Sequence, residues 1–359
     1  MNHPIKRLLL MLSLLIFAAS LLPLPAFAAE ESDSWEALVE QLLLETEADE
    51  TTAALGYYNT VTGEEHYYNG DRYFSGASLY KLPLNMYCAE QITKGERSWD
   101  TETYGTTYED IQVSSLTYSN NPHSLNLVNE LGGWVRFRSL IAPYAGMDSE
   151  DEDFIGRGTF FTARQITRCA ALLATESERF PRVIDCLMDS APGLFLEYAD
   201  VPYDIAQKYA NNMDEGNTFH VAGIVYTDDP IALVVMSQNL ATQGTLMQRY
   251  CELMCDYTRK QRALRLEEEA EALRLAEEAE REAAEQAAAE KATEEEALRL
   301  AEEAEAKRLA EEEAIRAAAE ELAAQRAATK QRKLYWSLAA LALGGAAAAA
   351  AAFIFYKRK

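Results

Sequence analysis

Ser78 and Lys81 lie three residues apart in the segment FSGASLYKLPL, where an aromatic-rich, alternating stretch gives way to a helical pattern. Residues i and i+3 share one face of a helix, so the amine can reach the hydroxyl. A serine becomes a good nucleophile when a neighbour takes its proton, and a lysine buried near a helix start is pushed toward the neutral, basic form. The pair therefore predicts nucleophilic catalysis. The alternative is that Ser78 caps a helix and Lys81 is solvated.

Two further polar segments could complete such a site. The segment LTYSNNPHSLNLVNELGG places Ser119-Asn120-Asn121-Pro122 between two helical patterns, which by itself indicates a turn or a helix N-terminal cap. The segment DIAQKYANN places Lys208 on a predicted strand, just before the strand-like stretch FHVAGIVYTDDPIALVVMSQN.

These three segments resemble the three motifs of class A β-lactamases and related penicillin-binding proteins. ASLYKLPL is similar to the nucleophile helix, Ser119-Asn120-Asn121 to the S-D-N or S-x-N motif, and Lys208-Tyr209-Ala210 to the K-T/S-G motif. The resemblance covers roughly residues 35–257. It implies that Ser78 attacks an acyl group, that Lys81 and Ser119 move protons, and that Asn121 orients the substrate amide and Lys81.

The resemblance also implies a substrate-binding edge. Lys208 would supply the cation for a substrate carboxylate, with Tyr209 beside it, and the backbone N–H groups of Ser78 and Asn211 would form the oxyanion hole. His220, on the neighbouring strand, could face the cleft as a further polar contact. A plain strand histidine is the alternative.

Three departures from the family pattern bear on activity. Ala210 stands where the family has glycine, so its methyl group could crowd a substrate along the strand. Tyr209 replaces a threonine and loses a small hydroxyl. The E-x-x-x-N loop that activates water in class A enzymes is not found, although Glu150 and Glu152 lie near the expected place. Without a placed base we expect a long-lived acyl-enzyme.

The elements around these motifs predict an α+β fold. Residues 30–47 have helical apolar spacing, residues 51–76 alternate as strands joined by turns, and residues 79–94 are helical despite Pro83. The middle, residues 111–187, is mostly helical. Strands are expected around 205–209, 219–226 and 231–239, followed by a last helix through Cys255. We therefore expect an antiparallel sheet built from both ends of residues 29–257 and covered by helices.

The two ends of the chain indicate export and membrane anchoring. Residues 1–28 have a basic start, an apolar run and Ala26-Phe27-Ala28, which is typical of a cleaved signal peptide. A retained N-terminal anchor is the alternative. Residues 334–356 carry no charge and are long enough for a transmembrane helix, and the basic residues 357–359 would form a cytoplasmic end. A helix that only associates with the membrane is the alternative. The expectation is a single-pass protein of the cell membrane with an extracellular N-terminal domain.

Residues 258–333 form an Ala-, Glu-, Arg- and Lys-rich segment without Gly or Pro, in which an 18-residue pattern from Ala263 recurs from Ala297. Strong helix formers with Glu three or four residues from Arg or Lys predict a helical stalk. The apolar positions keep no steady heptad. A single helix, a coiled coil through which the protein self-associates, and a disordered linker therefore remain open.

Charge and composition exclude other classes of function. Residues 29–257 hold 37 acidic and 13 basic residues, a net charge of −24 within a total of −25, so nucleic-acid binding is not expected. The five cysteines and four histidines show no metal-ligand spacing, and no metal or cofactor is expected. Cys251 and Cys255 are expected to pack in the core, and a Cys169–Cys186 disulfide was left open.

The leading hypothesis is an extracellular, membrane-tethered serine acyl-transferring hydrolase that resembles class A β-lactamases and acts on a β-lactam or a peptidoglycan-type peptide. The second hypothesis is a catalytically degenerate module that binds the cell wall and is displayed on the stalk.

Overall fold

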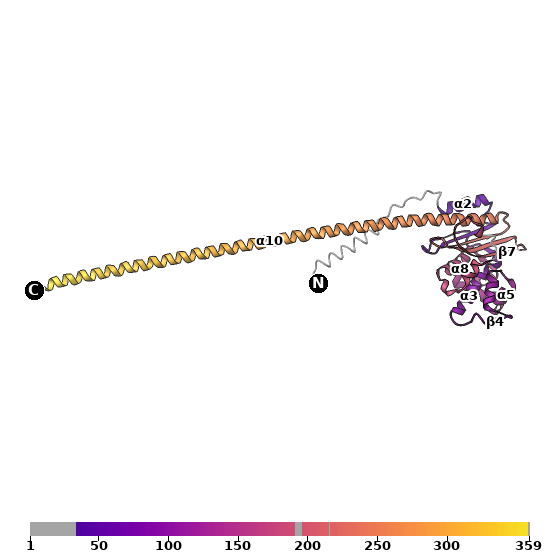
Figure 1. The fold of residues 1–359 in the computed structure, drawn as a ribbon, viewed down its shortest axis with the longest axis horizontal. Helices are drawn as coiled ribbons and strands as arrows, with labels where there is room; N and C mark the ends of the chain where they lie inside the picture. The colour runs from indigo at the N-terminus through magenta and orange to yellow at the C-terminus, as the bar shows by residue number, and fades with distance from the viewer. Residues whose placement is uncertain (1–33, 191–195, 215, 358–359) are drawn as a thin grey trace. The chain divides into compact units, whose positions relative to one another are not determined.

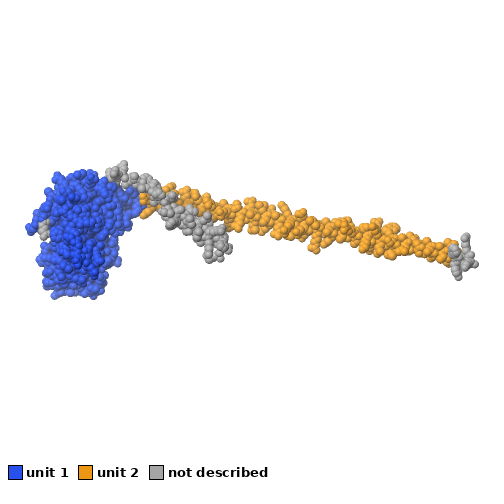
Figure 2. Space-filling view, turned by 180° about the vertical axis from the view of Figure 1, so that it is seen from behind, with its two compact units in different colours: residues 1–267 blue, residues 268–359 orange. Residues whose placement is uncertain are grey.

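The computed structural model describes residues 34–190, 196–214 and 216–357. The predicted signal peptide lies outside these residues. The chain divides into two compact units, residues 1–267 and 268–359, which are coloured separately in Figure 2. Each unit is described by itself.

The first unit is an α+β domain, as expected (Figure 1). Its strands are β1 (Ala53–Asn59), β2 (Glu65–Tyr68), β3 (Tyr73–Ser75), β4 (Glu102–Thr103), β5 (Thr106–Thr107), β6 (Phe160–Thr162), β7 (Ile205–Asn212), β8 (Thr218–Val225) and β9 (Ile231–Ser237). Its α-helices are α2 (Trp35–Thr46), α3 (Lys81–Thr93), α4 (Tyr108–Leu116), α5 (Asn121–Glu130), α6 (Gly133–Ile141), α7 (Glu152–Ile155), α8 (Ala163–Thr175) and α9 (Val183–Met188). The helix α10 (Gln243–Tyr356) begins in this unit. The 3₁₀ turns are η2 (Ala77–Tyr80), η3 (Ala142–Ala145), η4 (Ser177–Arg179) and η5 (Leu196–Tyr198).

The main sheet has the order β2-β1-β9-β8-β7 and is antiparallel throughout. Strands from both ends of the domain pair at its centre, where β1 lies beside β9. This confirms the expected assembly of the sheet from the two ends of the domain. A small second sheet pairs β3 with β6, and a third pairs β4 with β5.

Helices cover both faces of the main sheet, and the alternation of side chains along β9 shows why. Val234 and Met236 lie in a first core with helices such as α3 and α8, whereas Leu233 and Val235 lie in a second core with α2 and the start of α10. Successive residues of a strand point to opposite faces, so a strand covered on both sides must be apolar throughout. The sequence IALVVMS of β9 meets this requirement, and every one of its residues is buried.

All five cysteines are buried and free. The Cys169–Cys186 disulfide left open by the sequence is therefore not formed. Cys251 and Cys255 pack in the second core, as expected for residues one turn apart on the inner face of a helix. These thiols contribute apolar packing to the domain.

The second unit is the continuation of α10, which is helical and exposed along its described length. Ion pairs three or four residues apart, such as Arg274–Glu271 and Arg316–Glu320, support the helix locally. The structure thus favours a helix over a disordered linker. Among the residues that the structure describes, one helix is long and apolar enough to span a membrane, in the apolar C-terminal part of α10, and none of that stretch is buried.

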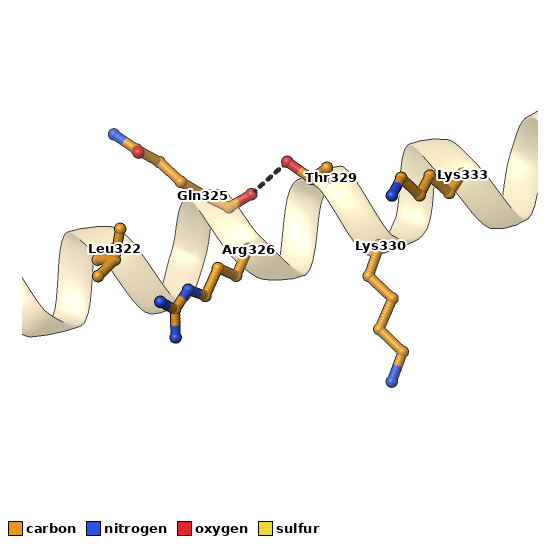
Figure 3. Close-up of a pocket in the computed structure, with 6 residues that line it drawn as sticks. All are labelled: Leu322, Gln325, Arg326, Thr329, Lys330 and Lys333. Atoms are coloured by element: carbon orange, nitrogen blue, oxygen red, sulfur yellow. Dashed lines mark hydrogen bonds between the residues drawn. The ribbon is translucent and has the colours of Figure 1, made fainter.

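Figure 3 shows six side chains on the stretch of α10 that precedes this apolar part. Leu322, Gln325, Arg326, Thr329, Lys330 and Lys333 project from a single helix and border an open depression. Thr329 donates a hydrogen bond to the Gln325 carbonyl, 2.8 Å away, within the helix itself. The depression is open to solvent, and the residues predicted to carry chemistry lie in the first unit.

Candidate active site

The local backbone presents Ser78 at the end of a short strand. β3 pairs with β6, and the Gly76 N–H donates to the Thr159 carbonyl, 2.9 Å away. A Cβ on residue 76 would lie 2.7 Å from that carbonyl oxygen, so the close approach requires glycine. Ala77 follows with a left-handed φ of 42°, an uncommon and costly conformation for alanine. The chain then enters η2, which holds Ser78, and α3 begins at Lys81.

Ser78 and Lys81 are in direct contact. Lys81 Nζ lies 2.9 Å from Ser78 Oγ, and no side-chain cap bond is made at the start of η2 or of α3. Lys81 is completely buried, while Ser78 is partly exposed. The alternative of a capping serine beside a solvated lysine therefore does not describe this site.

The loop between α4 and α5 supplies three more oxygens to the same amine. Lys81 Nζ lies 2.6 Å from the Ser119 carbonyl oxygen, 3.1 Å from Ser119 Oγ and 2.6 Å from Asn121 Oδ1. Asn120 caps α5 by accepting from the His123 N–H at 2.9 Å, and Ser119 has a left-handed φ of 55°. The segment is therefore both a helix cap, as its composition alone suggested, and a partner of Lys81.

The types of these oxygens fix what Lys81 can do. The Ser119 carbonyl and Asn121 Oδ1 can only accept hydrogen bonds, so two N–H groups of the amine point at them in either protonation state. The remaining position on Lys81 Nζ is left for the hydroxyl groups of Ser78 and Ser119, which can donate as well as accept. A neutral Lys81 can therefore take the proton of Ser78, and Ser119 Oγ lies within reach to pass a proton onward.

Burial prepares Lys81 for this role. Loss of solvation lowers the pKa of Lys81 to about 8, and no charged neighbour contributes to the shift. A lysine with its ordinary pKa would be almost wholly protonated at neutral pH. Near pH 8, about half of the Lys81 side chains would be neutral bases.

Lys208 is the second buried cation of the site. It lies on β7 with no exposed surface, and its Nζ donates to the Tyr209 carbonyl at 3.0 Å. Burial, and secondarily the charge of Lys81, lower the pKa of Lys208 to about 7. The charge of Lys81 thus acts on Lys208, so the two amines belong to one site. Among the described residues, no carboxylate hydrogen-bonds to either lysine.

The other residues predicted on this edge have different positions. Tyr209 is half-buried, with its ring centroid 4.3 Å from Lys208 Nζ, and Asn211 is exposed at the end of β7. Ala210 is completely buried in the first core, so its methyl group points into the protein. Lys208, two residues earlier, lies on the same face of β7 and is equally buried, so the expected crowding of a substrate by this methyl group stays a prediction.

His220 lies opposite Ala210 but does not reach the surface. Its Nδ1 accepts from the Ser237 N–H at 3.0 Å, which leaves the proton on Nε2 to donate to the Ser75 carbonyl at 2.6 Å. Burial lowers the pKa of His220 to about 4, so it is neutral at physiological pH. In place of the expected substrate contact, it ties the main sheet to the strand that precedes Ser78.

The segment that could have carried a second base presents its two glutamates to solvent. Glu150 and Glu152 are exposed. Arg138 holds the end of this segment in place. It is completely buried and donates hydrogen bonds to the carbonyls of Phe154 at 2.6 Å and Phe160 at 2.8 Å. The sequence motifs gave no indication of this role for Arg138. The only sequence signal for the close approach at residue 76 was that a glycine stands there, two residues before Ser78.

The pH dependence of Ser78 reactivity tests this arrangement. We expect the rate constant for labelling by an uncharged fluorophosphonate to rise about tenfold per pH unit and to level off above about pH 8, because neutral Lys81 is the base. Mass spectrometry of the labelled peptide measures it. Lys81→Met should remove the rise, and the exposed-site control Ser177→Ala should leave it unchanged. A rate independent of pH between 6 and 9 would contradict the assignment.

The comparisons with known proteins agree with this geometry. Residues 36–131, which include Ser78, Lys81, Ser119 and Asn121, match the model of the β-lactamase enzyme family. No curated protein sequence matches the chain.

Similar solved structures are class A β-lactamases and a related enzyme. An ancestral (GNCA) class A β-lactamase is 14% identical with a TM-score of 0.51, and covers 61% of this chain and 97% of its own. The class A β-lactamase of the last common ancestor of Gram-negative bacteria (GNCA4) is 17% identical with a TM-score of 0.52, covering 61% and 98%. A β-lactamase from Chitinophaga pinensis DSM 2588 is 16% identical with a TM-score of 0.51, covering 61% and 97%. The first unit thus has the fold of class A β-lactamases, and its N-terminal part matches the sequence model of the β-lactamase enzyme family.

Proposed function

We propose that this protein is a serine acyl-transferring hydrolase that forms an acyl-enzyme on Ser78 with a β-lactam or a peptidoglycan-type peptide. The observation that carries the proposal is the contact between Lys81 Nζ and Ser78 Oγ at 2.9 Å within a buried set of oxygen acceptors. In this mechanism, neutral Lys81 takes the Ser78 proton as Oγ attacks the acyl carbon. Ser119 then gives its own proton to the leaving group as the bond to the acyl carbon breaks, and takes one back from Lys81, which returns to the neutral amine.

The substrate class follows from the cations of the site. Lys208 is buried in a domain of strongly negative net charge, and such a position favours an anionic group brought by the ligand. A substrate carboxylate beside Lys208 would place the acyl group near Ser78. In the proposed complex, the backbone N–H groups of Ser78 and Asn211 stabilise the oxyanion, and Asn121 and Tyr209 contact the substrate.

Release of the acyl group is proposed to be slow. Class A enzymes, which the motifs resemble, use a glutamate in an E-x-x-x-N loop to activate water, and Glu150 and Glu152 are exposed on the segment that could supply one. Rapid β-lactam hydrolysis is therefore not proposed. A catalytically degenerate cell-wall binding module is the second candidate, favoured by the same missing base.

Labelling with a fluorescent penicillin separates the two candidates. We expect a covalent adduct at Ser78 that survives denaturing electrophoresis and is lost completely in Ser78→Ala, because the hydroxyl oxygen is the acylated atom. Ser177→Ala, which removes an exposed serine outside the site, is the matched control. No adduct in the wild-type protein at millimolar penicillin would favour the degenerate module.

The position of Ala210 makes a second prediction for the same assay. Ala210→Gly should change the labelling rate less than about twofold, because the methyl group lies in the core, and should destabilise the domain by about 1 kcal/mol, as glycine does within a strand. Lys208→Met should slow labelling at least about tenfold, because a charged hydrogen bond to the carboxylate is lost. A tenfold gain in Ala210→Gly would show that the methyl group does obstruct the substrate.

We also propose that the protein is exported, anchored by residues 334–356 as a single-pass helix, and displayed outside the cell on residues 258–333. The charge-free stretch, the Tyr335-Trp336 pair at its start and the basic residues 357–359 support this topology. Self-association through the stalk remains a weaker proposal, since the apolar residues along it form no steady seam.

Membrane extraction tests the anchor. The full chain should sediment with membranes and remain there after an alkaline carbonate wash, because about 23 uncharged residues span a bilayer. A chain truncated after residue 333 should be soluble. Release of the full chain by carbonate would indicate a helix that only associates with the membrane surface.

A further inference from the structure

Three buried polar side chains connect the helices behind the candidate active site. Asn85 of α3, Ser115 of α4 and Ser124 of α5 have no exposed surface. Asn85 Nδ2 lies 2.9 Å from Ser115 Oγ, and Ser115 Oγ lies 2.8 Å from Ser124 Oγ. The three side chains therefore form one continuous hydrogen-bonded chain across three helices.

The direction of every bond in this chain is fixed by its ends. Ser124 Oγ lies 2.6 Å from the Asn120 carbonyl, which can only accept, so Ser124 donates to it. Ser124 consequently accepts from Ser115, and Ser115 accepts from the Asn85 amide. The second N–H of that amide donates to the Lys81 carbonyl at 2.6 Å. No proton has an alternative place.

The two ends are the segments that meet at the active site. One end holds the backbone of Lys81, and the other holds the backbone of Asn120, between Ser119 and Asn121. The chain thus ties the helix that carries the base to the loop that supplies the base with its oxygens.

Stability alone does not account for such a chain. It lies beside the first core, where Leu84, Ile111, Leu127 and Val128 are buried. Apolar side chains of similar size could fill this space without the desolvation that polar groups require. Directional bonds, unlike apolar packing, specify one distance and one register between the helices.

We propose that Asn85, Ser115 and Ser124 are positioning residues that set the distance between the Lys81 amine and the Ser119-Asn121 loop. The inference rests on the proposed acylation of Ser78, because that reaction needs Lys81 within hydrogen-bond reach of Ser78. The contacts at stake are those of 2.6–3.1 Å around Lys81 Nζ. Misplacement of a catalytic group by about 1 Å can cost about a hundredfold in rate.

The decisive variant removes the whole chain, as Asn85→Leu, Ser115→Ala and Ser124→Ala together. Because the three polar side chains are removed together and only the carbonyls of Lys81 and Asn120 lose a donor, the full-length protein in mild detergent should unfold within about 5 °C of the wild type by near-ultraviolet circular dichroism. Its fluorophosphonate labelling rate at pH 8 should fall about 10- to 100-fold. The pH midpoint of labelling should move upward, because a displaced Lys81 gains water.

Matched variants separate positioning from general weakening. Thr46→Val removes a completely buried hydroxyl on α2, in the second core, and should leave labelling and its pH midpoint unchanged. Ser115→Ala alone removes one hydrogen-bond partner from Asn85 and one from Ser124, and should therefore lower both the melting temperature and the labelling rate. If the triple variant fails to fold, Ser115→Ala supplies the test through its pH midpoint. A folded variant with wild-type rate and midpoint overturns the proposal.

A readout independent of reaction distinguishes the two proposals. In carbon-13 lysine spectra, the Lys81 signal, assigned by its loss in Lys81→Arg, should titrate at higher pH in the triple variant than in the wild type. If the wild-type protein is labelled by neither reagent but this shift is seen, the acylation proposal fails and the positioning role stands. If labelling is normal and Lys81 titrates identically in both proteins, only the positioning role fails.

Discussion

The site depends on keeping the amine of Lys81 out of water and still fully hydrogen-bonded. Moving an ammonium into a protein interior costs several kcal/mol unless polar groups replace its hydration shell. Here four oxygens surround Nζ, two of them as obligatory acceptors, and they come from η2 and from the α4–α5 loop. Neither segment alone can satisfy the amine. The charge of Lys81 therefore couples the nucleophile turn to a loop about 40 residues away.

The main sheet holds the strands that border the site in fixed positions. Residues of β9 alternate between two cores, so the sheet is held from both faces and β7 has a defined position relative to α3. His220 adds a direct bond from β8 to Ser75, just before the nucleophile. Burial then outweighs the strongly negative net charge of the domain. Surface carboxylates would favour protonated lysines, yet desolvation lowers the pKa of both Lys81 and Lys208.

Local sequence predicted most of this arrangement where a residue's role depends on its near neighbours. The spacing of Ser78 and Lys81, the cap at Asn120 and the strands β7 to β9 are properties of short segments, and the structure has them. Positions decided by tertiary packing were harder to predict. His220 and Ala210 are placed by the register of β7 and β8, which no local pattern specifies. Arg138 and Asn85 have ordinary helical contexts and acquire their roles only from distant carbonyls and hydroxyls.

The segment that follows α6 shows that positioning a nucleophile and activating water are separable tasks. Arg138 fixes this segment through backbone carbonyls and lies 3.8 Å from the centroid of the Phe154 ring, so no acidic side chain is needed to hold it. The segment in turn presents the Thr159 carbonyl to Gly76 and pairs β6 with β3. Its glutamates, Glu150 and Glu152, are exposed, and Asp151 accepts the N–H groups of Asp153 and Phe154 at the start of α7. The same stretch of chain therefore supports the backbone before Ser78 through main-chain bonds, while these carboxylates serve the surface and the local helix.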